Sequence, residues 1–154
     1  MTMKISEFDI EYAYWLEDMH NAFWRRIDAC INITLIVLGT SVAASLSLDF
    51  AIGLSVALLA AINVVVQPLK KSLHARSQAS KLSKLLDSKH TMSDETLSEI
   101  LEGICEHSSD EVGMLTPLAF NQAAIILKKR PTKKYSLLNK LAGHFVGNLP
   151  ASKP

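Results

Sequence analysis

The distribution of charged residues constrains this chain more than any other feature of its sequence. No charged residue lies between Asp28 and Asp49 or between Asp49 and Lys70, so residues 29–48 and 50–69 are two uncharged runs of 20 residues each. A helix of about 20 mostly apolar residues is long enough to cross the hydrocarbon core of a bilayer. Because backbone polar groups cannot stay unpaired in lipid, both runs are predicted to be transmembrane helices joined by a tight turn.

The alternative is a soluble protein in which the two runs are buried core helices. Soluble helices normally carry a stripe of charged residues, and neither run has one. The polar content of the first run weakens the membrane signal; it comprises Asn32, Thr34, Thr40, Ser41 and Ser45. A cleaved signal peptide is not expected, because six acids and three bases precede the first run.

Basic residues beside the two runs predict the orientation of the hairpin. Arg25 and Arg26 precede the first run, and Lys70 and Lys71 follow the second, whereas the turn carries a single acid. Since Lys and Arg favour the cytoplasmic side, both termini are predicted to be cytoplasmic in a multi-pass protein of the inner membrane. Trp24 is predicted to be an anchor at the same interface, the alternative being a core position in a cytosolic helix.

Small and polar residues recur on one face of each predicted span. With the turn centred between residues 47 and 48, two asparagines lie at equal distances from it. These positions are predicted either to pack the two helices of one hairpin or to line a pore in an oligomer, and packing is the commoner use. The set is Asn32, Gly39, Ala43, Gly53 and Asn63. Pro68 predicts a kink, and therefore a candidate hinge, at the end of the second run.

The segments outside the membrane are also predicted to be helical. Apolar residues at spacings of three and four predict an amphipathic helix within residues 1–28 and a helical extension over residues 70–90. Residues 1–28 carry a net charge of −3 and residues 70–89 a net charge of +5. We therefore expect the two extensions to pair as an antiparallel stalk below the membrane.

Capping signals divide the C-terminal part into shorter helices over residues 91–148. Ser93 or Asp94 is predicted to cap one helix, Thr116-Pro117 to open the next, and Gly147 to end a final amphipathic helix. The sequence therefore predicts an all-α fold: a two-span transmembrane hairpin with cytosolic helical extensions and a small helical C-terminal part.

Charge is unevenly divided in this half of the chain. Residues 87–111 contain eight acids and one base, whereas residues 128–154 contain seven bases and no acid. The basic segment is predicted to bind anionic lipid or the acidic segment of its own chain, or else to be solvated; it comprises Lys128, Lys129, Arg130, Lys133 and Lys134. Nucleic acid is not the expected partner, because the aromatic residues are too few for a stacking platform. Residues 149–154 are expected to be a flexible tail.

The motifs of common enzymes are missing from the sequence. There is no metalloprotease motif, phosphate-binding loop, dinucleotide fingerprint or nucleophile elbow, so we expect no enzymatic activity and no cofactor. Cys105-Glu106-His107 has metal-ligand chemistry but lacks a second paired motif, so no metal site is predicted. Cys30 and Cys105 are not expected to form a disulfide.

Four segments carry a resemblance to a known family. They are the aromatic Tyr12-Ala13-Tyr14-Trp15, the basic Trp24-Arg25-Arg26, the small-residue Gly39-Thr40-Ser41, and the exit Pro68-Leu69-Lys70-Lys71 followed by His74. In this layout, residues 12–90 resemble the SLATT group of bacterial two-transmembrane effector proteins. The resemblance implies membrane pores formed in conflict and antiphage systems and triggered by partner proteins, with no catalytic residues. The chain departs from that family by carrying a C-terminal part of its own.

The hairpin and the resemblance together predict a bacterial or phage inner-membrane protein that oligomerises and perturbs or permeabilises the membrane in defence, immunity or exclusion. Its predicted partners are the lipid bilayer and further copies of itself. One alternative is a membrane anchor or adaptor that recruits a soluble protein through residues 90–154. Another is a holin-like protein, although holins are usually shorter and have little cytosolic bulk.

Overall fold

The computed structural model describes residues 6–43 and 49–152, and this part of the chain is helical with no strand. The predicted all-α class is therefore confirmed. The helices are α1 (Glu7–Ala43), α2 (Asp49–Val66), α3 (Pro68–Ser88), the short 3-10 helix η1 (Lys89–Thr91), α4 (Asp94–Cys105), α5 (Thr116–Ile126) and α6 (Leu137–Val146).

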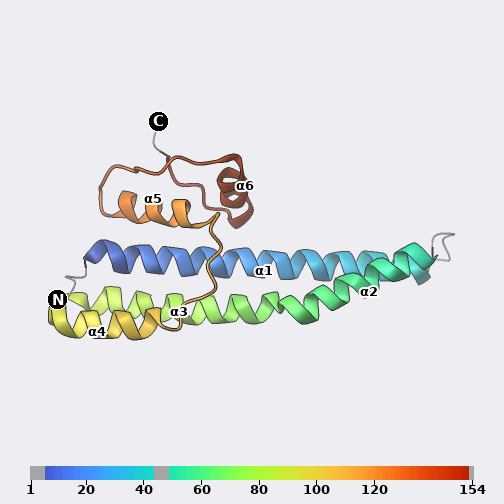
Figure 1. Ribbon diagram of the computed structural model, residues 1–154, viewed down its shortest axis with the longest axis horizontal. Coiled ribbons are helices and arrows are strands. Elements are labelled where there is room, and N and C mark those ends of the chain that lie inside the picture. Colours follow the sequence, from blue (N-terminus) through green and yellow to red (C-terminus); the bar gives the residue numbers. More distant parts are fainter. Residues whose placement is uncertain (1–5, 44–48, 153–154) are drawn as a thin grey trace.

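Helix α1 is the central element of the molecule. It is 37 residues long, so the predicted cytosolic helix and the start of the first uncharged run form one continuous rod. Figure 1 shows α3 and α4 on one side of this rod and α5 and α6 on the other, while α1 and α2 extend beyond the body as an arm. The folded body is therefore built around the first half of α1.

Helices α1 and α3 lie side by side, which is the pairing that their opposite charges predict. The hydroxyl of Ser72 on α3 donates a hydrogen bond to Oδ1 of Asn21 at 2.9 Å, and Lys89 forms an ion pair with Glu7. The stalk is not a bare pair of helices, however. Helices α4, α5 and α6 cover it, so it is the centre of a layered body.

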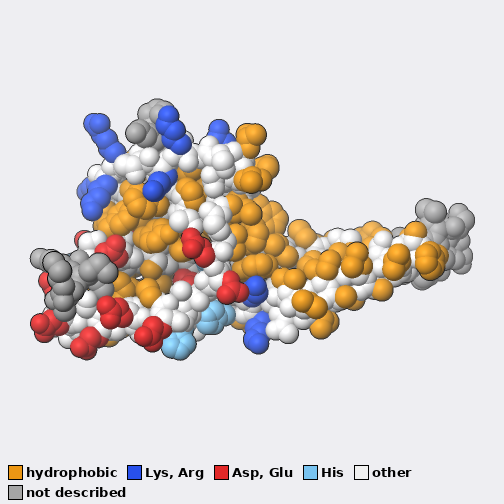
Figure 2. Space-filling view, in the orientation of Figure 1, with side chains coloured by type: hydrophobic (Ala, Val, Ile, Leu, Met, Phe, Trp, Pro, Cys, Tyr) orange, Lys and Arg blue, Asp and Glu red, His pale blue; other side chains and the backbone are white. Residues whose placement is uncertain are grey.

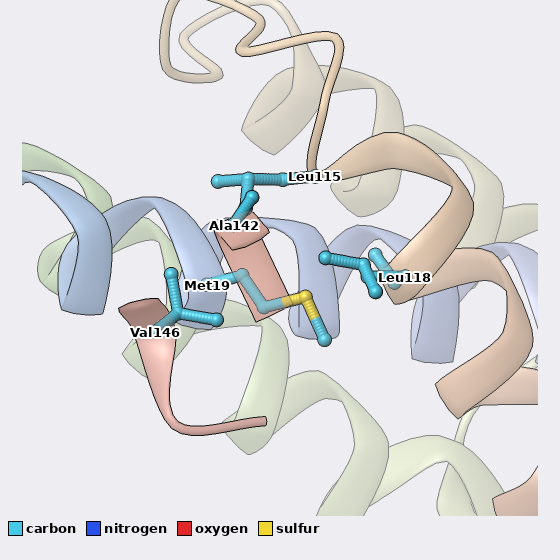
Figure 3. Packing of buried hydrophobic residues seen from close by; sticks show 6 residues of the cluster. Met19, Leu115, Leu118, Ala142 and Val146 are labelled. Carbon is cyan, nitrogen blue, oxygen red and sulfur yellow. The ribbon is translucent and has the colours of Figure 1, made fainter. Parts of the chain in front are cut away.

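One hydrophobic core lies between α1, α5 and α6. Its buried members come from all three helices and from the residue before α5, and Figure 3 shows them converging around Met19. They are Met19, Leu115, Leu118, Ala119, Ala142 and Val146.

A second hydrophobic core lies on the other side of α1, against α3 and α4. It is formed by Ile10, Leu82, Leu85 and Leu101. Helix α1 is thus buried on two faces, whereas the sequence pattern indicated a single apolar stripe. A helix packed on two sides needs apolar residues on both faces. Met19 is on the face of α1 that packs against α5 and α6, and Ile10 and Tyr14 are on the face that packs against α3 and α4.

The helix is interrupted between α2 and α3, where the sequence predicts a kink. Gln67 has φ 49° and ψ 55°, in the left-handed region, and the buried Pro68 opens α3. Proline suits the first turn of a helix because it has no N–H to donate. A hinge at this point stays a prediction.

Most of the predicted caps are present. The hydroxyl of Ser93 accepts the N–H of Thr96 at 3.3 Å, and Gly147 ends α6 in the left-handed conformation. The start predicted for α5 at Thr116-Pro117 is confirmed, but Leu115 rather than Thr116 occupies the cap position. The Thr116 hydroxyl donates to Glu111 at 2.8 Å instead of capping the helix.

The start of the expected flexible tail is packed against the body. Pro150 is buried, and the side chain of Leu149 occupies the space beside Gly143, where an added Cβ would lie 2.6 Å from Leu149 Cδ1. The end of the expected tail, residues 153–154, lies outside the described residues.

Candidate membrane interface

The predicted interface anchors meet where the body gives way to the arm. The ammonium group of Lys71 on α3 lies 4.7 Å from the ring centroid of Trp24 on α1. Arg25 and Lys70, the neighbouring anchors, are exposed. The hairpin thus brings basic and aromatic residues from two distant segments to one level along α1, as the sequence predicts for a membrane boundary.

Arg26 has a partner that sequence reasoning did not find. Its guanidinium donates a hydrogen bond to the carbonyl of Phe145 near the end of α6, 119 residues away. The rings of Phe23 and Phe145 also meet at 5.6 Å between centroids. Arg26 therefore ties α6 to the point on α1 where the arm begins.

Two pockets flank the break at Gln67. One, of about 380 Å³, is lined by residues that include Trp24, Lys71 and Asp110. The other, of about 500 Å³, is lined by residues that include Asn32 and Asn63. Both pockets therefore lie at the same level along α1 as the predicted anchors.

The two asparagines lie as the hairpin register predicts but do not bond to each other. Both line the larger pocket, while the Asn32 amide donates to Asp28 Oδ2 at 3.0 Å. Within the described residues no hydrogen bond joins Asn32 to Asn63. Asp28 lies one turn before Asn32 on the same helix, so a local carboxylate has replaced the predicted amide partner.

Among the described residues, the two glycines of the arm face open space. A Cβ added to Gly39 or to Gly53 would meet no atom within 4 Å. The side chain of Ala43 lies outside the described residues. These two glycine positions are therefore open among the described residues, and their roles in helix packing or in a pore stay predictions.

Helix α2 is the strongest membrane feature of the structure. Among the described residues, one helix is long and apolar enough to cross a membrane; it begins at Phe50 and includes α2. None of its apolar stretch is buried within the protein. Figure 2 shows the arm as a narrow projection with hydrophobic side chains along its length. The first uncharged run is helical as far as Ala43, and residues 44–48, where the turn is predicted, lie outside the described residues.

The basic segment lies at the end of the body that is farther from the arm. Lys129 lies over the ring of Phe8 at 5.4 Å and Lys133 over the ring of Phe120 at 4.9 Å. Phe8 precedes Ala29 by 21 residues on α1, which is about 32 Å along a helix. Electrostatic interactions are screened over about 8 Å in physiological salt. This geometry separates Lys129 from the bilayer that the arm would enter.

The basic segment is not paired with the acidic segment either. In the described part of the chain, the lysine–carboxylate ion pairs are Lys71–Asp110 at 3.2 Å and Lys89–Glu7. Neither involves residues 128–134. Lys128, Arg130 and Lys134 are exposed, so this surface faces solvent in a single copy.

A buried polar latch holds the α4–α5 linker on α1, and sequence reasoning missed it. Glu17 is only 4% exposed and accepts two hydrogen bonds from Ser109, from its N–H at 2.7 Å and from its hydroxyl at 2.6 Å. Nε2 of the buried His20 accepts the N–H of Val112 at 3.2 Å. Burial lowers the pKa of His20, and the nearby carboxylates only partly oppose this effect.

Comparison of the chain with protein-family models, curated proteins and solved structures gives no match. The resemblance to the SLATT group therefore stays a prediction, and the assignment of this interface rests on its geometry. In residues 6–43 and 49–152, no group of three or more His, Cys, Asp or Glu side chains is arranged to hold a metal ion. Cys30 and Cys105 are free and exposed.

Proposed function

We propose that this chain is an inner-membrane protein whose arm inserts as a two-span hairpin, whose body is cytosolic, and whose copies associate through the hairpin and perturb the bilayer. The observation that carries the proposal is the bare apolar arm on a body that has two cores of its own. In the core helix of a soluble protein, the apolar stretch would be buried. Here Phe50 is 85% exposed and Val65 is 82% exposed.

The open glycines support association between copies. In a bilayer, helices associate through small residues that let their backbones approach closely. Gly39 and Gly53 have that chemistry, and within the described residues a Cβ added to either would meet no atom within 4 Å. A second copy packed on this face would make use of both positions.

Insertion is tested by alkaline carbonate extraction of membranes and by reporters fused before Met1 and after Pro154. We expect the chain to stay with the membrane and both reporters to be cytoplasmic. Recovery in the supernatant, or a periplasmic signal from either fusion, would refute the hairpin.

Association and perturbation are tested with a matched pair of substitutions on α2. Gly53→Leu fills the open face, whereas Ala51→Leu adds bulk at an exposed position about 200° around the helix. We expect Gly53→Leu to reduce both the fraction of oligomeric protein and the depolarisation of the membrane detected by a dye. We expect Ala51→Leu to change neither quantity. Equal behaviour of the two variants, or no depolarisation by inserted protein under any trigger, would contradict the proposal.

A second candidate function is an adaptor that recruits a soluble acidic protein, and the position of the basic segment favours it. Lys128, Arg130 and Lys134 face solvent at the end of the body remote from the arm. Full-length chain in nanodiscs, compared with a variant that carries Glu at these three positions, distinguishes the functions. A stoichiometric partner retained only by the unchanged chain would support the adaptor.

A further inference from the structure

Helix α6 has an apolar face that the protein does not cover. Leu137, Leu138 and Leu141 are 79%, 64% and 65% exposed. The opposite face of the same helix enters the first core through Ala142 and Val146. A surface helix of a soluble protein normally turns charged residues outward, so these exposed leucines call for an apolar environment outside the chain.

Helix α6 is held beside the start of the uncharged arm, where the bilayer would be the apolar environment. Its C-terminal end is tied to Arg26 and Phe23, through the carbonyl and the ring of Phe145. Arg26 lies three residues before Ala29, where the first uncharged run begins, and this is about 4.5 Å along the helix. Figure 1 shows α6 at the end of its layer nearest to the arm and lying across the direction of α1.

The exposed face is continuous with the apolar arm. Figure 2 shows hydrophobic side chains gathered at the α6 end of the upper lobe, on the side that faces the arm. If α1 crosses the bilayer, a helix lying across α1 at this level lies in the plane of the interface. Amphipathic helices bind membranes in that orientation, with the apolar face at the boundary between headgroups and acyl chains.

We infer that α6 is an interfacial helix whose Leu137, Leu138 and Leu141 insert into the cytoplasmic leaflet beside the hairpin. The charge of α6 itself suits an anionic leaflet, because the helix contains no acid and its Lys140 is exposed. The inference rests on the proposed function in one respect, since the arm places α6 at the membrane. It adds a lipid contact that neither the uncharged runs nor the basic segment predicts.

The test uses the full-length chain in vesicles of phosphatidylcholine and phosphatidylglycerol, with Cys30 and Cys105 changed to Ser. A single Leu141→Cys, Leu58→Cys or Lys129→Cys substitution then carries an environment-sensitive dye. All three positions are exposed, so the labels do not disturb either core. Lipids with a spin label near the headgroup or deep in the acyl chain act as quenchers.

We expect the dye at position 141 to be quenched at least two-fold by the shallow label, the dye at position 58 by the deep label, and the dye at position 129 by neither. A quenched position 58 with an unquenched position 141 would overturn the α6 contact and leave the proposed hairpin standing. An unquenched position 58 would instead refute the hairpin, and quenching at position 141 in that case would still support α6 as a membrane-surface helix. A blue-shifted but unquenched dye at position 141 would mean that protein covers this face, which would also overturn the inference.

A second variant measures the contribution of the leucine face. Changing Leu137 and Leu141 together to Ser leaves the core face of α6 unchanged, because both side chains are exposed. With the dye at a Leu138→Cys position, we expect shallow quenching to fall at least three-fold. Unchanged quenching would show that these leucines do not hold α6 on the bilayer.

Discussion

Removing the carboxylate of Glu17 should destabilise the helical body through the latch on the α4–α5 linker. Glu17→Ala deletes the acceptor of two short hydrogen bonds, from the N–H and the hydroxyl of Ser109. Hydrogen bonds to a charged group contribute about 1.5–3 kcal/mol each. Relief of the desolvation of the buried carboxylate offsets part of this loss. We therefore expect the free energy of unfolding to fall by about 2–4 kcal/mol.

The matched control is Glu17→Gln, which keeps the size of the side chain. Its amide oxygen can accept the Ser109 N–H while its NH2 group donates to the Ser109 hydroxyl. The loss should therefore be only about 1 kcal/mol. Urea unfolding of the detergent-solubilised chain, followed by the fluorescence of Trp15 and Trp24, measures both values.

A double-mutant cycle with Ser109→Ala tests whether the contact itself is responsible. In the Glu17→Ala background the hydroxyl of Ser109 has already lost its acceptor, so its removal should have little further effect. We expect a coupling energy of about 1.5–3 kcal/mol. Additivity within about 0.5 kcal/mol would refute the latch, as would a Ser109 amide that stays protected from hydrogen exchange in Glu17→Ala.

Three further predictions concern the body. Burial lowers the pKa of His20, and Glu17, Glu111 and Asp110 only partly oppose this effect, so the unfolded chain takes up a proton more readily than the folded chain. The free energy of unfolding should therefore be at its full value above the unfolded pKa of about 6.5 and fall as the pH drops below it. Urea midpoints measured across this pH range should fall less in His20→Gln than in the unchanged chain. Gly147→Ala should lower the free energy of unfolding by about 1–2 kcal/mol in the same assay, because φ is +74° and the new Cβ would lie 2.8 Å from Arg26 Nη2. The control Gly103→Ala should not lower it, because a Cβ at that position meets nothing within 4 Å. Leu118→Ala should cost about 2–5 kcal/mol, since this side chain is fully buried in the core around Met19, and an unfolding midpoint equal to that of the unchanged chain would show that this core is loosely packed.

Local signals in the sequence were sufficient for much of the fold. The break at Pro68, the cap at Ser93 and the end of α6 at Gly147 each depend on the backbone preferences of one residue type. The pairing of α1 with α3 follows from the hairpin and from opposite charges. These features lie where the sequence places them because their causes act over a few residues or across one turn.

The missed features depend on contacts between distant segments. Arg26 reads as an interface anchor beside an apolar run, and nothing near it in the sequence indicates the carbonyl of Phe145. Glu17 lies among the acids of an amphipathic helix, and only the packed linker identifies it as the acceptor for Ser109. For Asn32 the carboxylate of Asp28 lies one turn away on the same helix, and a register taken from the hairpin alone does not include this local partner.

The two sides of the arm differ in how firmly they are held. Helix α1 is fixed between two cores and runs without interruption from the body into the arm, so its direction is set by packing. Helix α2 packs against α1 and continues into α3 through Gln67. The backbone hydrogen bonds on either side of Gln67 persist, from Gln67 N–H to Asn63 O at 3.0 Å and from Lys71 N–H to Gln67 O at 3.1 Å. The left-handed conformation of a non-glycine residue costs about 1–2 kcal/mol. This cost is confined to Gln67, where the helix axis changes direction and the neighbouring backbone hydrogen bonds are kept. The crossing of α2 over α1 is therefore controlled by the backbone of Gln67, at the level where Trp24 and Lys71 mark the proposed membrane boundary.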